Sequence, residues 1–427
     1  MRSVAVLQIG GFTESVIQAL AGVFIARLLQ PELFGVYALA FSLAGLVSLF
    51  LGVGVQDAIS TVLGETYTRN DSDKTKEALA FLLKILVITG FIALLGAFFA
   101  PWIAQALYHN SRIGIYAAIV ILAVIVNTTF FSLSSLVLQV TGKIRQMMIL
   151  GIADQIARYG VSVALVFWGF GVLGGTSGHL IGAVIIFFVS LVVWEKVRRK
   201  NRIFPSLRRL FSQARTVCVK KYLGFSVWIA IDRNVANLYG LLPVLLTGIF
   251  VSSSEVTFFK LSFAYINLAM SLLGPISVLL NVEFPKMKVE RGNQLGRNFI
   301  KVSLYSLGMS AVLTAAAIVA APIAFKFFYG VNFLPSVKYV FGLFAYGALF
   351  GIGVGLGPMW RAINKVKTSI LINAITLGIG VPLGLLLIKN LGVWGSVIMV
   401  TLWFTISHFV SFVCLAKFLK KANENNF

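Results

Sequence analysis

The sequence predicts an all-α polytopic membrane protein of about twelve transmembrane helices, arranged as two six-helix lobes related by a parallel internal repeat. Apolar segments of about 20 residues recur along the whole chain, the length that crosses a hydrocarbon core of roughly 30 Å. Only 12% of the residues are charged, and the mean hydropathy is +0.93. One strongly basic stretch divides the chain into two apolar halves of similar length. A β-barrel would instead show short segments of alternating polarity.

Twelve spans can be placed along the chain. They lie near residues 4–27, 36–63, 80–100, 115–139, 147–169, 175–194, 222–249, 257–281, 300–325, 336–359, 368–388 and 394–416. Four prolines fall inside spans of the second half: Pro243, Pro275, Pro358 and Pro382. In the first half, Pro31 and Pro101 are expected at helix ends. Because an interior proline removes a backbone hydrogen bond and kinks a helix, we expect more bent helices in the second half.

The basic stretch from Glu195 to Lys221 contains ten Lys or Arg residues and a single acidic residue. A segment with this charge is excluded from lipid, so we interpret it as a solvated cytoplasmic connector. Its membrane-spanning flanks argue against nucleic-acid binding. The predicted domains are therefore an N-terminal lobe at 1–194, the connector at 195–221 and a C-terminal lobe at 222–427.

The distribution of basic residues predicts the orientation. If both termini are cytoplasmic, the inside gaps hold 28 of the 36 Lys and Arg residues and the outside gaps hold 6. Arg158 and Arg233 remain within the spans. Cytoplasmic loops of membrane proteins carry an excess of Lys and Arg. We therefore expect a multi-pass protein of the plasma or cytoplasmic membrane with both termini in the cytoplasm.

Three short matches relate the two halves. The segment 34–41 at the start of the second span resembles 256–263 at the start of the eighth, 222 residues later. Residues 142–145 precede the fifth span as 364–367 precede the eleventh, and the Gly-containing turns 171–174 and 392–395 join corresponding spans. Chance recurrence of glycine turns and basic loop ends is the alternative. Matches at offsets of 222, 222 and 221 residues, all on the same side, predict a parallel repeat about an axis along the membrane normal.

Ionisable residues within spans are costly and are therefore candidates for function. Span seven holds Asp232, Arg233, Asn234 and Asn237, about ten residues from its start and so near the membrane midplane. At about 100° per residue these side chains cover a wide arc, which predicts that they line a wet cavity or a lobe interface. A structural network that joins helices is an equal alternative.

Four further candidates lie in the first half. Asp154 and Arg158 have i,i+4 spacing with the acid first, which favours pairing along one helix face. Glu14 has no obvious partner in its own helix, so it is expected either to bind Na⁺ or a proton or to pair with a neighbouring helix. Asp57 is close enough to its helix end to reach water.

One stretch of the chain resembles a known family. Residues 27–38, Arg-Leu-Leu-Gln-Pro-Glu-Leu-Phe-Gly-Val-Tyr-Ala, are similar to the first-loop pattern of Wzx-type polysaccharide-biosynthesis flippases of the multidrug/oligosaccharidyl-lipid/polysaccharide exporter superfamily. That pattern usually has glycine where this chain has Gln30. Asp232-Arg233 and the run 258–261 resemble its second-half counterpart. The resemblance implies two lobes around a central cavity and, as substrate, an oligosaccharide on a polyprenyl (pyro)phosphate carrier.

The expected function is therefore flipping of a lipid-linked oligosaccharide from the cytoplasmic to the outer leaflet of the bilayer, with H⁺ or Na⁺ as a possible coupling ion. A multidrug or cation antiporter is the alternative, since embedded carboxylates suit cationic substrates. A membrane glycosyltransferase or polymerase is less favoured, because the outer gaps are short and poor in acids. We expect no enzyme activity, cofactor or metal site: the two cysteines and three histidines share no ligand spacing, and no phosphate-binding loop is present.

Overall fold

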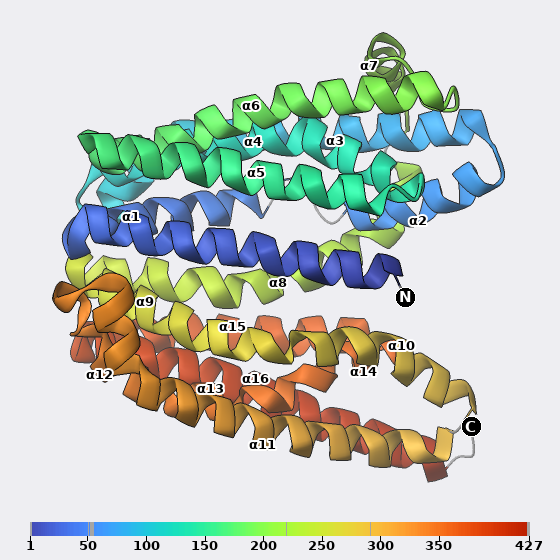
Figure 1. The fold of residues 1–427 in the computed structure, drawn as a ribbon. Helices are drawn as coiled ribbons and strands as arrows, with labels where there is room; N and C mark the ends of the chain where they lie inside the picture. The colour runs from blue at the N-terminus through green and yellow to red at the C-terminus, as the bar shows by residue number, and fades with distance from the viewer. Residues whose placement is uncertain (1, 50, 52–54, 219, 291, 425–427) are drawn as a thin grey trace. The chain divides into compact units, whose positions relative to one another are not determined.

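The computed structural model describes all residues except 1, 50, 52–54, 219, 291 and 425–427; the side chains of some others, including Asp57, 220–230 and Arg233, are also outside the description. The described chain is helical without strands, and it divides into two compact units, Met1–Asn234 and Val235–Phe427. The division falls within one helix, α8 (Figure 1).

The first unit contains seven helices and the start of α8. They are α1 (Arg2–Ser48), α2 (Val55–Thr68), α3 (Ser72–Tyr108), α4 (Ser111–Val140), α5 (Ile144–Leu165), α6 (Gly171–Lys200), α7 (Leu207–Thr216) and α8 (Lys220–Phe250). The second unit continues with α9 (Ser253–Met270), α10 (Gly274–Glu290), α11 (Gly292–Ala324), α12 (Ser336–Gly342), α13 (Phe344–Leu349), α14 (Leu356–Ala362), α15 (Val366–Leu391) and α16 (Val393–Glu424).

The predicted spans have helical counterparts in the described residues. Eight stretches are long and apolar enough to cross a membrane, or nine if the bent pair Val331–Gly342 and Phe344–Ala362 is one span. Two of these stretches, Ile9–Ser48 and Ile144–Lys200, each contain a break and so correspond to two predicted spans. The shorter apolar helix Asn234–Phe250 corresponds to span seven. The protein is therefore an all-α multi-pass membrane protein, as predicted.

The breaks have identifiable backbone causes. Within α1, Gln30 has φ 61° and ψ 168°, and Pro31 begins the second arm. Between α5 and α6, a π-helical turn at Val166–Phe170 ends in Gly169 and Gly171, both with positive φ. Residues with a side chain rarely adopt such angles, so glycine is the expected residue at these positions. Gln30 is the exception among them.

Three expectations about local structure were wrong. Span two is not one helix over 36–63, since α1 ends at Ser48 and α2 begins at Val55. The sequence between them contains two glycines, which have low helix propensity. Pro101 lies inside α3 and not at a helix end, because α3 continues to Tyr108. The third error concerns the connector, described below.

Local geometry supports the proposed repeat. Gly171 and Gly392, matched in the sequence, have φ/ψ of 56°/−141° and 57°/−134°. Gly142 and Asn364, also matched, both have positive φ. The ring pair Tyr37–Phe41 in the first unit corresponds to the pair Phe259–Phe263 in the second, each one turn apart on its helix. All three sequence matches therefore carry similar local structure.

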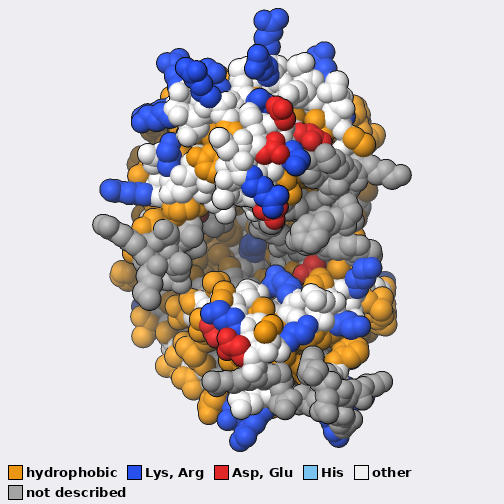
Figure 2. Space-filling view, turned by 90° about the vertical axis from the view of Figure 1, so that its right-hand side faces the viewer, with side chains coloured by type: hydrophobic (Ala, Val, Ile, Leu, Met, Phe, Trp, Pro, Cys, Tyr) orange, Lys and Arg blue, Asp and Glu red, His pale blue; other side chains and the backbone are white. Residues whose placement is uncertain are grey.

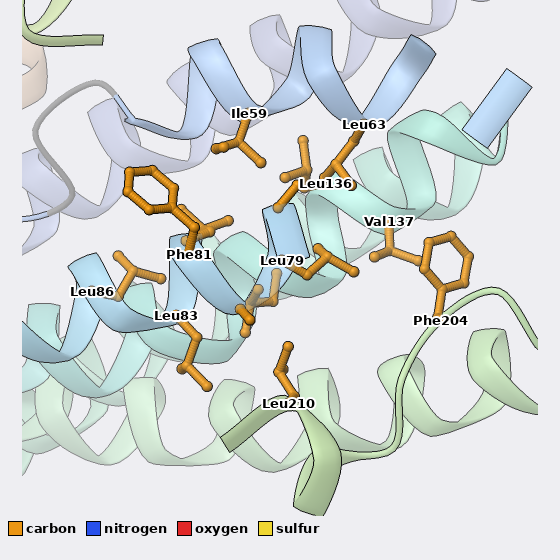
Figure 3. Close-up of a cluster of buried hydrophobic side chains, with 14 of the residues drawn as sticks. Ile59, Leu63, Leu79, Phe81, Leu83, Leu86, Leu136, Val137, Phe204 and Leu210 are labelled. Atoms are coloured by element: carbon orange, nitrogen blue, oxygen red, sulfur yellow. The ribbon is translucent and has the colours of Figure 1, made fainter. Parts of the chain in front are cut away.

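The connector is not simply a solvated loop. Its first residues extend α6 to Lys200, and residues 207–216 form α7. Phe204 and Leu210 are buried together with apolar side chains from α2, α3 and α4 (Figure 3). At the other end of α7, Lys84 of α3 donates to the backbone carbonyls of Arg215 and Val217 at 3.2 and 2.8 Å. The connector is therefore packed into the first unit through these apolar side chains, while Arg202, Arg208, Arg209 and Arg215 are exposed.

Candidate functional site

Asp154 and Arg158 form an ion pair on α5. Arg158 Nε donates to Asp154 Oδ1 at 2.7 Å, and Arg158 Nη2 pairs with Oδ2. The side chain of Asp154 is 3% exposed and that of Arg158 is 16% exposed. The predicted i,i+4 pairing is confirmed, and it forms a two-pronged contact with directed hydrogen bonds.

Two neighbouring helices contribute polar groups to this pair. Asn127 of α4 donates through Nδ2 to Asp154 Oδ1 at 3.0 Å. His179 of α6 lies with Nε2 at 3.1 Å from Arg158 Nη1. Sequence reasoning missed both residues. An amide inside span four and a histidine inside span six were the available signals, since polar side chains in apolar spans need partners.

The hydrogen bond fixes the tautomer of His179. An arginine has donors only, so His179 Nε2 must accept and the ring proton is on Nδ1. Phe41 of α1 and Tyr159 of α5 pack edge-on against the imidazole, with ring centroids at 5.1 and 5.0 Å. His179 Nδ1 has no partner in the described part of the chain. The imidazole is thus flanked by two aromatic rings, and its Nδ1–H group is a hydrogen-bond donor without a partner among the described residues.

Close contact between helices makes the network possible. A Cβ at Gly182 of α6 would clash with the α5 backbone at Arg158, and one at Gly178 would clash at Ser162. Ser162 Oγ also donates to the carbonyl of Gly175 at 2.8 Å. Small residues on α6 therefore let α5 approach closely, which brings His179 within reach of Arg158.

Glu14 belongs to the same region. It is half-buried on α1, and a Cβ at Gly151 of α5 would clash with its Oε1 atom. Gly151 precedes Asp154 by three residues, so the Glu14 carboxylate lies beside the charges of Asp154 and Arg158. The structure therefore brings together three of the four predicted candidates of the first half. The side chain of the fourth, Asp57, lies outside the described residues.

The predicted residues of span seven are on α8. Asn234 Nδ2 donates to the carbonyl of Leu49, at the end of α1, at 2.8 Å. Asp232 is half-buried and takes part in an interaction within the structure, and Asn237 is exposed. The side chain of Arg233 lies outside the described residues. The role of this set in substrate binding stays a prediction.

The second unit contains a cavity that sequence reasoning did not find. Its volume is about 400 Å³, and Arg361, His408 and Asn267 contribute polar groups to its wall together with Ser271 and Ser277. Tyr346, which is buried, donates to Asn267 Oδ1 at 2.5 Å. Arg361 was counted as an inside-gap residue. Within the described residues, no cluster of His, Cys, Asp and Glu could hold a metal ion.

Comparisons with known proteins place the chain in a family. The model of the family described as polysaccharide biosynthesis protein matches residues 24–338. Comparison with curated proteins gives no match. A solved structure described as the inward-facing conformation of a multidrug resistance MATE family transporter of the MOP superfamily is similar with a TM-score of 0.74 and 15% identity, covering 98% of this chain and 99% of that one.

Two further structures are similar over nearly the same length. A MATE transporter in complex with MaD5 has a TM-score of 0.67 and 15% identity, with 99% of this chain and 96% of that one covered. A MOP superfamily transporter from Pyrococcus furiosus, whose binding pocket is described as having reverse polarity, has a TM-score of 0.63 and 15% identity, with 99% and 95% covered. At this identity the likeness concerns the fold. The chain therefore belongs to the polysaccharide biosynthesis protein family, and it is a multi-pass membrane protein with the fold that these MOP superfamily transporters share.

Proposed function

We propose that the protein flips a polyprenyl-(pyro)phosphate-linked oligosaccharide from the cytoplasmic to the outer leaflet of the cell membrane during synthesis of a surface polysaccharide. The observation that carries this proposal is the family match, which extends over residues 24–338 within a transporter fold. The protein acts as a transporter without a catalytic step. The headgroup crosses through polar surroundings while the polyprenyl tail stays in lipid.

The arrangement of arginines supports an anionic headgroup. A guanidinium offers paired donors to phosphate oxygens. Arg158 is held by Asp154 and His179, which leaves Arg233 as the embedded arginine for the substrate. Arg361, beside amide and hydroxyl groups in the cavity of the second unit, is suited to a sugar phosphate. We therefore assign Arg233 to the (pyro)phosphate, with Asp232, Asn234 and Asn237 beside it, and we add the Arg361 cavity as a subsite for the glycan.

The acidic groups of the first unit favour a role in coupling. Glu14 lies beside Asp154, whose charge Arg158 already balances. A carboxylate in this position is suited to exchange H⁺ or Na⁺ during transport. The same groups support the second candidate function, export of a cationic drug in exchange for an ion.

The charge bias supports the orientation. We place both termini and the connector in the cytoplasm, since Lys and Arg are concentrated in the gaps on that side. The glycan substrate then enters from the leaflet where its carrier is glycosylated.

Reconstitution tests the proposed function and separates it from the alternative. Proteoliposomes would contain a polyprenyl-pyrophosphate-linked sugar with a fluorescent label that an impermeant reductant quenches. In protein-free liposomes the label in the inner leaflet is protected from the reductant. We expect the protein to move this labelled lipid to the outer leaflet, so that its fluorescence is lost faster. A labelled phosphatidylcholine serves as the control lipid and is expected to stay protected. Accelerated efflux of a cationic dye with no effect on the lipid-linked sugar would favour the antiporter and overturn the flippase.

A further inference from the structure

A basic cleft lies where α3 begins, α6 ends and α7 begins. Its volume is about 440 Å³, and its walls are the side chains of Lys76, Arg198, Arg199, Arg202 and Arg209, with residues 204–206 between them. Figure 2 shows Lys and Arg side chains gathered on the end of the molecule that carries α7. The transport mechanism proposed above does not use this cleft.

One wall residue of the cleft, Phe204, is packed in the apolar core. Phe204 is 4% exposed and stacks on Tyr67 of α2, with ring centroids at 5.8 Å and planes 8° apart. The ring of Trp194 on α6 is tilted against that of Phe204, with centroids 6.5 Å apart. Leu210 of α7 is fully buried (Figure 3). Side chains in such close-packed surroundings keep their positions. The basic residues therefore project from a framework that is held by the apolar core, unlike those of a mobile loop.

The positive charge of the cleft is only partly balanced. Glu195 binds Arg198 at 2.7 and 2.5 Å and Arg199 at 3.1 Å, so one carboxylate serves two guanidinium groups. Asp73 lies 3.4 Å from Lys76, but its side chain is 97% exposed. Arg202 and Arg209 make no ion pair with any described residue. Two guanidinium groups thus face the cleft with their donors available.

The start of α7 adds further donors. Ser206 caps this ten-residue helix, and its hydroxyl accepts from the backbone N–H of Arg209 at 3.5 Å. The first amides of a helix have no acceptor within the helix and carry a partial positive charge. Pro205 and Ser206 are part of the cleft wall, so this helix end opens on the same space as the arginines.

We propose that this cleft binds a phosphate-bearing anion, with Arg202 and Arg209 as its main ligands. Guanidinium forks and helix amides match the several oxygens of a phosphate group. The group has two possible sources, the headgroup of an anionic phospholipid and a free polyphosphate of the aqueous phase. The alternative is a solvated basic patch that only contributes to membrane topology. In that case, removing any two of its arginines would weaken phosphate binding equally.

Binding measurements on the full-length protein distinguish a site from a patch. The protein in neutral detergent is titrated with radiolabelled pyrophosphate, and phosphatidylglycerol retained from mixed micelles is counted by native mass spectrometry. The variant Arg202→Ala/Arg209→Ala removes the two free ligands. The variant Arg208→Ala/Arg215→Ala removes the same charge from the same connector, at exposed positions outside the cleft.

We expect Arg202→Ala/Arg209→Ala to weaken phosphate binding at least tenfold and Arg208→Ala/Arg215→Ala to change it less than twofold. Saturable pyrophosphate binding with this pattern supports the site and identifies a free polyphosphate as its ligand. Retained phosphatidylglycerol with this pattern, in the absence of pyrophosphate binding, supports the site with a lipid headgroup. Equal losses in the two variants, or no saturable binding of either probe, would overturn the proposal.

Discussion

Arg158 Nη1 lies 3.1 Å from Nε2 of His179, so the arginine links α5 to a neutral histidine on α6. The same guanidinium binds Asp154, and Asn127 donates to Oδ1 of that carboxylate, the oxygen that also accepts from Arg158 Nε. The charges of the pair therefore balance within one helix, and both ends are held by neutral groups from other helices. This arrangement satisfies most donors and acceptors of a buried ion pair, the condition under which such a pair is tolerated.

Removal of one partner is expected to be more harmful than removal of both. Asp154→Ala leaves Arg158 buried without its acid, which costs about 3–5 kcal/mol of unfolding free energy. Asp154→Ala/Arg158→Met removes the uncompensated charge and is expected to lose less than Asp154→Ala alone. Denaturant unfolding in micelles of the unaltered protein, Asp154→Ala, Arg158→Met and the double variant gives the coupling energy of the cycle.

The half-exposed pair of Glu195 and Arg198 provides the control. Their side chains are 34% and 33% exposed, so water already solvates them. Glu195→Ala is expected to lower the free energy of unfolding much less than Asp154→Ala does, because solvent screens the exposed pair. A cost for Asp154→Ala as small as that for Glu195→Ala would contradict the importance of the buried network.

Gln30 holds a backbone conformation that favours glycine. Its φ of 61° and ψ of 168° lie in a region that costs a residue with a side chain about 1–3 kcal/mol. Its side chain offsets part of this, since Nε2 donates to the carbonyl of Arg27 at 2.6 Å. Gln30→Gly is therefore expected to raise the unfolding midpoint. Gln139→Gly, at an exposed position inside α4, is the matched control and is expected to lower stability by about 1 kcal/mol. Destabilisation by both variants would show that Gln30 is not strained.

Local rules predicted much of this structure, and tertiary contacts explain the rest. The spacing of Asp154 and Arg158 was sufficient to predict their pair, because both lie on one helix face. Asn127 and His179 join them from α4 and α6, and no local rule relates those positions. The strained conformation of Gln30 agrees with the glycine that the family pattern has there.

The connector contains an apolar helical pattern in addition to its many basic residues. Leu207, Leu210, Phe211 and Ala214 recur at helical spacing within a segment that was interpreted from its charge alone. Leu210 and Ala214 are buried in α7, so this periodicity indicates the helix that an interpretation based on charge alone overlooked. The cavity of the second unit could not be predicted in this way, because Arg361 and His408 lie on different helices of that unit.

Asp71 gives the start of α3 a dependence on pH. Its carboxylate accepts from the backbone N–H of Lys74 at 3.1 Å, which is the main reason that its pKa is lowered. Because the pKa is lower in the folded state, the stabilisation is complete above the unfolded value of about 3.9 and is lost as the pH falls through the folded pKa. Amide hydrogen exchange, corrected for intrinsic rates, is expected to show loss of protection at residues 73–75 below that range. Asp71→Asn caps equally well without titrating. Equal pH dependence in this variant would exclude the carboxylate as the cause.

The orientation can be tested with single cysteines. Cys218 and Cys414 are free and would first be replaced. Arg202→Cys is in the connector and exposed, and Ser111→Cys is exposed at the start of α4. We expect an impermeant maleimide to label position 111 in intact cells and position 202 only after permeabilisation, since the charge bias places the connector inside. Labelling of position 202 from outside would reverse the proposed topology.

The proposed role of Arg233 leads to a graded set of variants. Its i−4 and i+4 neighbours are Ile229 and Asn237, so its own helix offers no acid at pairing distance along the same face. If Arg233 binds the substrate phosphate, Arg233→Ala abolishes transport of the lipid-linked sugar and leaves expression and thermal stability unchanged. Arg233→Lys recovers part of the activity, because an ammonium group replaces the two-pronged guanidinium.

Arg297→Ala, which removes an exposed arginine in a predicted inside gap, serves as the control and is expected to transport normally. A purely structural role predicts lower thermal stability in Arg233→Ala, with recovery on addition of Asp232→Ala. Full transport by a stable Arg233→Ala protein would remove this residue from the substrate site.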